Sequence, residues 1–539
     1  MTSNQSDLIV TGSHGGMVNG IRTFTVLAVV SMISACGGGG GSGFNGGGGG
    51  SGGSGSGWVP GVFLAASSFR GMCAAPRAGT GDIQGTSTDE NNYLRSYSDN
   101  TYLWYDEIQD RDPALYATPA YFDLLVTNAL TQSENAKDRF HFTYPTDEWI
   151  ALSQSGAAAG YGAQFAILQS TPPRQIVVAY TDPNMPATAP PPGADLDRGA
   201  EVLEVDGVDV VNGSNVDALN AAFFPSAAGE THTFTVRDLG AMGTRTFTME
   251  SAIVVSTPVQ NVTTIATASG TVGYMLFNSH IATAERGLFN AITTLEAAGV
   301  SDLIIDLRYN GGGFLDIASE LSYMVAGDAQ TGGRTFELYT FNDKHPSTNP
   351  ITGQAIAPYG FHSTSVGFDP SLAAGTPLPT LDLTRVFVLT GSGTCSASES
   401  VMNSLRGVGV EVIQIGSTTC GKPYGFYAQD NCGTTYFTIQ FRGENDQGFG
   451  DYSDGFTPVD AVNNIVPKLP GCSVGDDFTA ALGDPAELRL AAALNYVETG
   501  TCPALTGVRT PGVSKPAIIG DENMLIPKSP WHQNRIVRR

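Results

Sequence analysis

The stretch Val-Phe-Val-Leu-Thr-Gly-Ser-Gly-Thr-Cys-Ser-Ala-Ser-Glu, residues 386–399, decides the fold of this chain. Its first five residues are β-branched or apolar and predict a buried strand, and the two glycines that follow predict a tight turn. From Ser396 to about Arg406 the sequence predicts a helix. A strand, a turn and a helix start would point backbone N–H groups outward at Ser396, where an anionic intermediate is favoured.

Lys422 lies 26 residues beyond that serine, just past a second apolar strand at residues 412–415. If the two strands are parallel neighbours, their ends meet at one edge of the sheet, where α/β active sites usually lie. A buried lysine can lose its proton and activate a serine, which is a weak nucleophile by itself. The plainer alternatives are that Ser396 only caps the helix, that Ser398 is the nucleophile, or that Lys422 is a solvated turn residue.

The surrounding sequence alternates apolar strands with helices, a pattern typical of a mostly parallel sheet covered on both faces. The expected elements are strands at 272–277 and 303–307, helices at about 284–298 and 315–325, a loop-rich excursion at 327–383, and a last helix at 485–498.

Three motifs in this order resemble the carboxyl-terminal processing peptidases, which are serine endopeptidases with a Ser–Lys dyad. The motifs are Asp-Leu-Arg-Tyr-Asn-Gly-Gly-Gly at 306–313, Thr-Cys-Ser-Ala-Ser-Glu at 394–399, and Gly-Lys at 421–422. The resemblance covers roughly residues 85–500. It implies an α/β, crotonase-like catalytic core, a PDZ-like β domain and a small helical N-terminal domain.

The same resemblance assigns the catalytic roles. It implies Ser396 as nucleophile, Lys422 as general base, and the backbone N–H groups of Gly312 and Ala397 as the oxyanion hole. The sequence departs from the family in two respects: Phe426 stands where active members often carry an orienting glutamine, and the spacing from serine to lysine is about one residue longer. Gln429 is the candidate substitute for the orienting residue.

Other polar residues near the motifs are expected to be structural. Asp306 and Arg308 are expected to brace the sheet as a buried ion pair, His280 to be a structural histidine, and Glu399 to be an acid in the first turn of its helix. No Cys/His spacing predicts a metal site, and no cofactor is expected.

Two regions precede the core. Aromatic residues at helical spacing predict a helical N-terminal domain at 89–150, and Lys-Asp-Arg-Phe at 137–140 also matches the family. Residues 157–252 have short strands and many turns. There, Gly160-Tyr161-Gly162-Ala163 resembles the loop with which a PDZ domain offers N–H groups to a peptide's terminal carboxylate. The alternative is a small β domain that only packs against the core.

The N-terminus predicts export. Residues 23–35 form an apolar run that is too short to span a membrane and is typical of a signal peptide. Ile-Ser-Ala-Cys at 33–36 resembles a bacterial lipobox, with Cys36 as the lipidated residue, although an ordinary secretion signal is the alternative. The true start is either Met1 or Met17. Gly37 after the cysteine would suit an outer-membrane destination, so we expect a lipid-anchored protein of the cell envelope.

Six further cysteines predict disulfides in an oxidising compartment, although six allow fifteen pairings. Cys420 with Cys432 would clip a hairpin that carries Lys422, and Cys472 with Cys502 would bracket the last helix. By elimination, Cys73 would then pair with Cys395. The formal net charge of −24 argues against nucleic acid as a partner, because phosphate binding needs clustered Lys and Arg.

The sequence therefore predicts six segments: a lipoprotein signal peptide at 1–36, a Gly/Ser-rich tether and irregular segment at 37–88, a helical domain at 89–150, a PDZ-like domain at 157–252, a catalytic core at 265–502 and an extended tail at 503–539. The expected function is a serine endopeptidase that recognises protein or peptide C-termini. The alternative is a non-catalytic ligand- or peptide-binding protein on the same scaffold, as in the interphotoreceptor retinoid-binding protein. The oligomeric state is left open.

Overall fold

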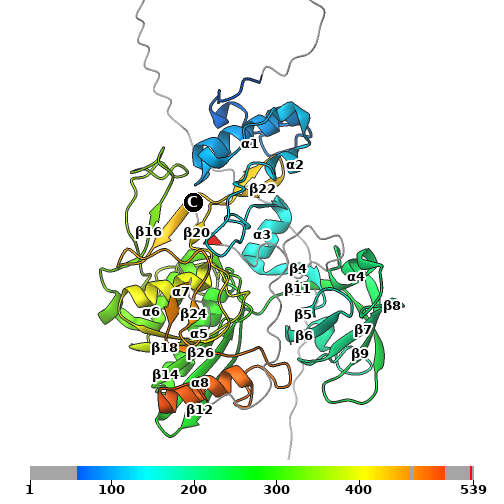
Figure 1. The fold of residues 1–539 in the computed structure, drawn as a ribbon, viewed down its shortest axis with the longest axis vertical. Helices are drawn as coiled ribbons and strands as arrows, with labels where there is room; N and C mark the ends of the chain where they lie inside the picture. The colour runs from blue at the N-terminus through cyan, green and yellow to red at the C-terminus, as the bar shows by residue number, and fades with distance from the viewer. Residues whose placement is uncertain (1–57, 462–465, 504–534, 537–539) are drawn as a thin grey trace, which may run out of the picture. The chain divides into compact units, whose positions relative to one another are not determined.

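The computed structural model describes residues 58–461, 466–503 and 535–536, all within one compact unit (Figure 1). The predicted signal peptide, the lipobox Cys36 and most of the tether and C-terminal tail lie outside the described residues. Among the described helices, none has both the length and the apolar character needed to cross a membrane.

A six-stranded sheet forms the core, in the order β12-β13-β14-β18-β19-β26. Its strands are β12 (Val259–Thr267), β13 (Gly270–Phe277), β14 (Asp302–Asp306), β18 (Arg385–Thr390), β19 (Glu411–Gly416) and β26 (Gly471–Ser473). All neighbouring pairs are parallel except β12 with β13. The predicted strands at 272–277, 303–307, 386–390 and 412–415 all lie in this sheet.

Helices cover both faces of the sheet because successive strand residues point to opposite sides. Val386 and Val388 of β18 pack into one apolar cluster, and Phe387 and Leu389 pack into another. The first cluster contains α5 (Ala284–Ala297), α6 (Leu315–Thr331) and α7 (Ala397–Gly407), and the second contains α8 (Leu488–Thr499). α6 runs past the predicted end near 325, with non-helical backbone angles at Gly327.

Residues 157–255 build a second β unit with its own apolar core. Its sheet contains β5 (Ala163–Gln169), β6 (Gln175–Thr181), β7 (Glu201–Val205), β8 (Val208–Asp209), β9 (Thr231–Arg237) and β10 (Arg245–Glu250), beside α4 (Val216–Phe223). β4 (Ala157–Gly160) pairs with β11 (Ala252–Val255) where the chain enters and leaves this unit. Ala166, Val177 and Ala179 pack into the same cluster as α8.

The N-terminal region is less helical than its aromatic spacing predicts. It contains α1 (Ser87–Thr101), α2 (Thr118–Phe122), β3 (Phe142–Pro145) and α3 (Thr146–Ser155). Two prolines limit the length of the helices here. Pro113 and Pro119 each stand in the first turn of a short helix, and a longer helix could not run through either position. β3 pairs with β22 (Thr434–Phe437) and joins this region to a sheet with β21 (Gln429–Asn431).

The remaining strands are short and lie around the core. They are β1 (Met72–Cys73) with β2 (Ile83–Gln84), β16 (Thr335–Thr340) with β17 (Tyr359–Gly360), β23 (Phe441–Glu444) and β20 (Tyr424–Gly425), β24 (Thr457–Pro458) with β25 (Lys468–Leu469), and β15 (Gly313–Phe314) with β27 (Arg535–Ile536).

Three disulfides cross-link the chain: Cys73–Cys432, Cys395–Cys420 and Cys472–Cys502. The prediction of Cys472 with Cys502 is confirmed. The predicted pairs Cys420–Cys432 and Cys73–Cys395 are wrong. The fold places Cys395 and Cys420 with their Cα atoms 5.1 Å apart, within the range that a disulfide requires.

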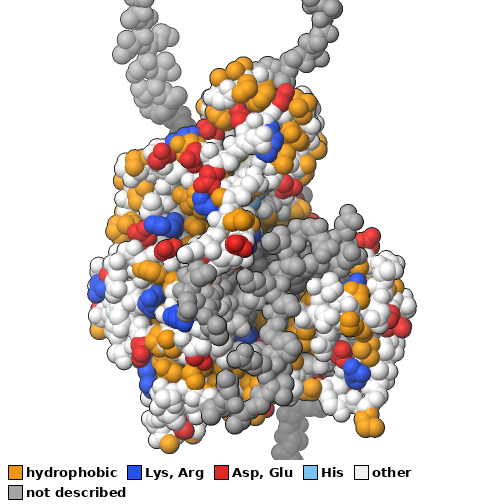
Figure 2. Space-filling view, in the orientation of Figure 1, with side chains coloured by type: hydrophobic (Ala, Val, Ile, Leu, Met, Phe, Trp, Pro, Cys, Tyr) orange, Lys and Arg blue, Asp and Glu red, His pale blue; other side chains and the backbone are white. Residues whose placement is uncertain are grey.

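Charged side chains on the visible face are mixed in sign. Figure 2 shows Lys and Arg side chains scattered singly among acidic and apolar ones, without a large basic field.

Candidate active site

Ser396 stands at the sharp turn between β18 and α7, as the sequence predicts. Its backbone angles, φ 63° and ψ −115°, are in a region that costs a non-glycine residue conformational energy. Its side chain is fully buried, and its Oγ makes no hydrogen bond to the described part of the chain. Strain of this kind is a recognised device for presenting a nucleophile at the end of a strand.

Lys422 is fully buried in an aromatic pocket. Its Nζ lies 4.7 Å from the ring centre of Phe140 and 4.3 Å from that of Phe426. Burial lowers the pKa of Lys422 well below its ordinary value, and the carboxylates of Asp138 and Glu399 oppose this only in part. The pocket therefore favours a neutral amine, the form that can accept a proton.

Glu399 ties the serine's turn to the lysine's loop. Its Oε2 accepts hydrogen bonds from the backbone N–H groups of Ser396 (2.9 Å) and Lys422 (2.8 Å). Its Oε1 accepts from the Gly421 N–H (2.8 Å) and the Thr419 hydroxyl (2.5 Å). Burial raises the pKa of Glu399, and these donors counter that shift. The carboxyl group is thus more than the first-turn helix acid that the sequence predicts.

A covalent link reinforces that connection. The Cys395–Cys420 disulfide joins the residue before the serine to the residue two before the lysine. Arg139 donates a hydrogen bond to the Cys420 carbonyl. It lies in the chain between Asp138 and Phe140, the two other residues of this segment near Lys422.

The glycine loop at 311–313 lies against the turn of Ser396. The Asn310 carbonyl accepts from the Cys395 N–H (3.1 Å) and from the Ser398 hydroxyl (3.0 Å). The side chain of Asn310 donates to the Phe277 carbonyl, and its Oδ1 accepts from the Gly312 N–H at 2.9 Å. The predicted oxyanion donor of Gly312 therefore already has an acceptor in this structure. Ala397, the other predicted donor, is buried at the first position of α7.

Gly312 and Gly313 need to be glycine, because their φ angles are 101° and 139°. A Cβ on Gly313 would also lie 2.3 Å from the His280 carbonyl oxygen. His280 itself is buried, with Nδ1 3.0 Å from Asn310 Oδ1. Burial lowers the pKa of His280 to about 3, so the ring is neutral at physiological pH and braces the loop.

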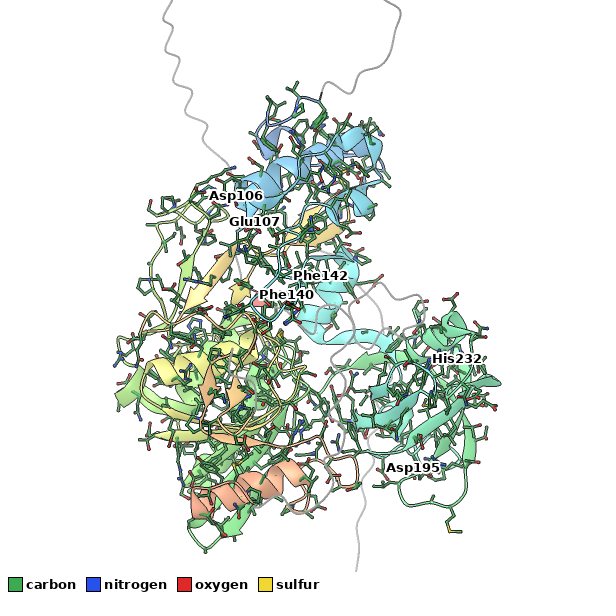
Figure 3. The ribbon with its side chains drawn as sticks, in the orientation of Figure 1. Asp106, Glu107, Phe140, Phe142, Asp195 and His232 are labelled. Carbon is green, nitrogen blue, oxygen red and sulfur yellow. A yellow bond between two sulfur atoms is a disulfide. The ribbon has the colours of Figure 1, made fainter. Side chains whose placement is uncertain are left out.

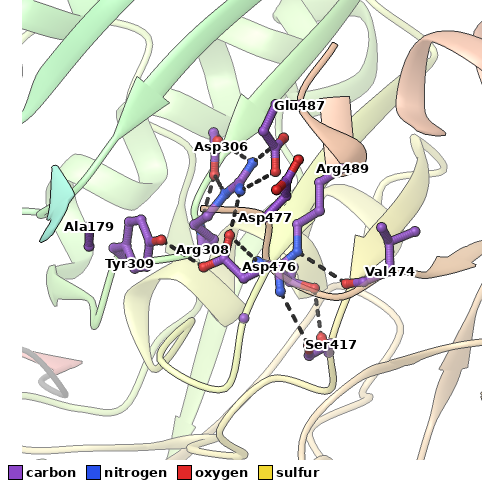
Figure 4. A network of polar contacts seen from close by, with 12 residues as sticks. Ala179, Asp306, Arg308, Tyr309, Ser417, Val474, Asp476, Asp477, Glu487 and Arg489 are labelled. Carbon is purple, nitrogen blue, oxygen red and sulfur yellow. Dashed lines mark hydrogen bonds and ion pairs between the residues drawn. The ribbon is translucent and has the colours of Figure 1, made fainter. Parts of the chain in front are cut away.

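The two residues before Asn310, Arg308 and Tyr309, belong to a buried charge cluster (Figure 4). Arg308 pairs with Asp306 as predicted, and also with Asp476 and Glu487. Arg198, from the second β unit, pairs with Asp476 and donates to the Tyr309 hydroxyl at 2.7 Å. Tyr309 directly precedes Asn310, so the second β unit contacts the segment that carries the glycine loop.

The remaining predicted residues lie in β21 and at the second β unit. Gln429 is buried in β21, where its Nε2 donates to the Asp430 carbonyl at 2.9 Å. Gly160, Tyr161, Gly162 and Ala163 join β4 to β5. The Gly162 carbonyl accepts from the Asp182 N–H, and the buried Tyr161 donates its hydroxyl proton to the Ala222 carbonyl.

Two groups of side chains have spacing suited to a metal ion in the described ranges: Cys73, Glu90 and Cys432, and Cys395, Glu399 and Cys420. In both groups the cysteines are disulfide-bonded and offer no thiolate. Glu399 also accepts four hydrogen bonds already. Neither group presents a free set of ligands.

Sequence reasoning did not assign three contributors to the site. Asp138 and Phe140 were noticed only as part of a family-like run, and their place at Lys422 depends on a contact across more than 280 residues. Figure 3 labels Phe140 on the segment between α2 and α3. The role of Asn310 could have been predicted, because an asparagine side chain beside consecutive glycines commonly accepts hydrogen bonds that fix a turn.

An aromatic pocket of about 380 Å³ adjoins the lysine's loop. Its walls include Trp104, Tyr105, Phe341 and Tyr424, with Asp106, Asp343 and Arg442 as its charged members. Tyr424 belongs to β20, two residues beyond Lys422.

Comparisons with known proteins give a consistent result. Residues 271–425 match the sequence profile of Peptidase family S41. A carboxyl-terminal-processing protease of Picosynechococcus sp. is 26% identical over 274 residues, which is 51% of this chain and 56% of that relative's length. The match thus spans a little over half of that relative.

One solved structure agrees with the fold. A Bacteroides fragilis protein named as an S41 protease superposes with a TM-score of 0.56 at 21% identity, over 76% of this chain and 97% of that one. The photosystem II D1 C-terminal processing protease gives a TM-score of 0.41 at 19% identity, over 76% of this chain and all of that one.

Proposed function

We propose that this chain, whose residues 271–425 match Peptidase family S41, is a carboxyl-terminal processing peptidase: a serine endopeptidase acting on exported proteins or peptides. One observation carries the proposal most: the fully buried Lys422, whose loop is tied to the turn of Ser396 by Glu399 and by a disulfide. A structural lysine would not need an aromatic pocket that removes its charge.

The reaction follows from these groups. Neutral Lys422 Nζ takes the proton of Ser396 Oγ as that oxygen attacks the scissile carbonyl carbon. The N–H groups of Ala397 and Gly312 stabilise the resulting oxyanion, once the Gly312 N–H is released from Asn310. The lysine then gives its proton to the leaving amine, and water hydrolyses the acyl-enzyme ester by the same proton path.

Glu399 positions the main chain of Lys422, and Gln429 stays the candidate for orienting its amine. Glu399 accepts the Lys422 backbone N–H, and Gln429 is buried in β21, seven residues after the lysine. The position four residues after the lysine holds Phe426, which contributes apolar cover for the amine.

The test is hydrolysis of an unfolded protein substrate by wild type, Ser396→Ala, Lys422→Ala and Lys422→Arg. We expect all three variants to lose roughly 10³-fold or more in rate, as in other serine enzymes. The arginine variant keeps a cation but cannot act as a base. Turnover equal to wild type in any of the three rejects the mechanism.

A second candidate is a non-catalytic binding protein on the same scaffold. The engaged Gly312 N–H and the phenylalanine at the family's glutamine position favour it. The two candidates separate in the same experiment, because a binding protein would show no hydrolysis dependent on Ser396.

We further propose that residues 157–252 form a PDZ-like domain that captures substrate C-termini at Gly160–Ala163, within the α/β, crotonase-like architecture. The short strands, the separate core and the carboxylate-type loop support this. A peptide with a free terminal carboxylate should bind at least tenfold more tightly than its amidated twin. Equal affinities would reject it.

Finally, we propose a lipid anchor at Cys36 and a place in the cell envelope. The apolar run and the lipobox-like sequence support this. The intact protein should partition into detergent, Cys36→Ser should remain aqueous, and equal partitioning would contradict the anchor.

A further inference from the structure

The short strand β15 has both of its edges occupied. On one side His280 donates its N–H to the Gly312 carbonyl (3.0 Å), and the Phe314 N–H donates to the His280 carbonyl (2.8 Å). On the other side lies the C-terminal strand β27, parallel to β15, with Gly313 opposite Arg535 and Phe314 opposite Ile536.

β27 reaches this place from the far end of the chain. It also lies against β20, and Figure 1 shows it in red beside that strand. It is separated in the sequence from the rest of the described chain, which ends at residue 503.

β27 contacts two strands, β15 and β20, that closely follow the loops of the proposed catalytic groups. β15 begins one residue after Gly312, and β20 begins two residues after Lys422. The strand therefore runs between the loop of the proposed oxyanion donor and the loop of the proposed base. An extended peptide added to an exposed strand edge is a common mode of peptide recognition.

Two further observations agree with an occupied, resting site. The Gly312 N–H is held by Asn310 rather than directed to an oxyanion, and Ser396 Oγ has no partner in the described part of the chain. By sequence, the last five residues, Arg-Ile-Val-Arg-Arg, are basic, whereas the whole chain carries a formal charge of −24.

We propose that the strand Arg535–Ile536 occupies the peptide-binding edge of the chain's own active site, so that the protein is self-occluded until a competing peptide displaces it. The edge at β15 would then take extended peptides by main-chain pairing. This inference rests on the proposed function for its effect on activity, but the occupancy can be measured without turnover.

The first experiment uses the full chain. Arg535→Pro/Ile536→Pro removes both N–H donors of the strand, and its matched control Arg535→Ala/Ile536→Ala keeps them. We expect the proline pair to hydrolyse an unfolded protein roughly tenfold faster than the alanine pair, as the loss of one or two main-chain hydrogen bonds would allow.

The second experiment measures binding. A labelled peptide with the sequence of residues 530–539 is added to the proline pair in a Ser396→Ala background, and fluorescence anisotropy is recorded. The control peptide carries N-methyl groups at the amides of positions 535 and 536 and should bind roughly tenfold more weakly, because it lacks the same donors.

Either of two results overturns the proposal: equal turnover by the proline and alanine pairs, or equal binding of the plain and methylated peptides. If Ser396→Ala removes no turnover, the proposed function fails instead. The binding experiment then decides the occupancy alone.

Discussion

At the scale of single residues, the chemistry depends on an amine held without charge. Ser396 and Lys422 could be placed from the sequence because each follows an apolar strand. The roles of Glu399 and Phe140 could not, since they depend on contacts with loops distant in the chain. A residue that accepts hydrogen bonds from main-chain N–H groups of a distant loop cannot be recognised from the sequence around it.

Glu399→Gln should lower activity roughly 10- to 100-fold and reduce the free energy of unfolding by about 1–3 kcal/mol, because an amide cannot accept all four hydrogen bonds. A specific readout is the pH–rate profile. The Glu399 carboxylate raises the pKa of Lys422, so its loss should move the acidic limb of the profile to lower pH. A shift of the acidic limb to higher pH would contradict the role of the Glu399 carboxylate as a negative charge near Lys422.

Lys422→Met should abolish hydrolysis and yet stabilise the fold. Burial places the folded-state pKa of Lys422 below its unfolded value, so the wild type loses stability as the pH falls from about 10.5 through the folded pKa. The gain in the free energy of unfolding of Lys422→Met over wild type should therefore be larger at pH 7 than at pH 9.5, as measured by chemical denaturation. The matched control is Lys344→Met, at a partly exposed ion pair with Asp99, which should give no such gain. A destabilised Lys422→Met would refute the buried-amine account.

At the scale of elements, the four central strands of the core sheet were predictable because apolar strands and amphipathic helices alternate there. The outer strands β12 and β26 and the last turns of α6 were not predicted. The N-terminal region was not predictable, because aromatic spacing predicted more helix than the prolines at 113 and 119 permit. Of the three predicted disulfides, only Cys472 with Cys502 was correct. The other two pairs depend on how distant loops meet, and spacing does not reveal that.

The Cys395–Cys420 disulfide should matter more for catalysis than for folding alone. Replacing both residues by Ser should reduce stability by about 2–4 kcal/mol and lower kcat, because the loop of Lys422 loses a restraint. Cys472→Ser/Cys502→Ser is the matched control. It opens a loop of 30 residues, close in length to the 25-residue loop of Cys395–Cys420, and it lies away from the dyad. It should cost similar stability at unchanged kcat. Equal kcat losses in both variants would contradict a specific role.

At the scale of the whole molecule, the second β unit and the core share one charge cluster. Sequence reasoning predicted only its Asp306–Arg308 part, because Arg198 and Asp476 are 278 residues apart. Figure 4 shows Arg308, Tyr309, Asp476 and Glu487 together in this cluster.

Arg198→Met should therefore lower the free energy of unfolding by about 3–5 kcal/mol, because it leaves buried acceptors unpaired. It should also slow hydrolysis, since Tyr309 loses a partner next to Asn310. Arg237→Met, at an exposed ion pair with Glu201 in the same unit, should change stability by less than about 1 kcal/mol. Similar effects of the two substitutions would exclude the cluster as a link between the units.

The most direct measurement is the titration of Lys422 itself. The chain has only six lysines, so the ε-carbon signal of Lys422 in isotope-labelled protein can be assigned by comparison with Lys422→Met. The account predicts that this amine titrates well below 10.5, together with the acidic limb of the pH–rate profile. A Lys422 that titrates near 10.5 in the folded protein would contradict it.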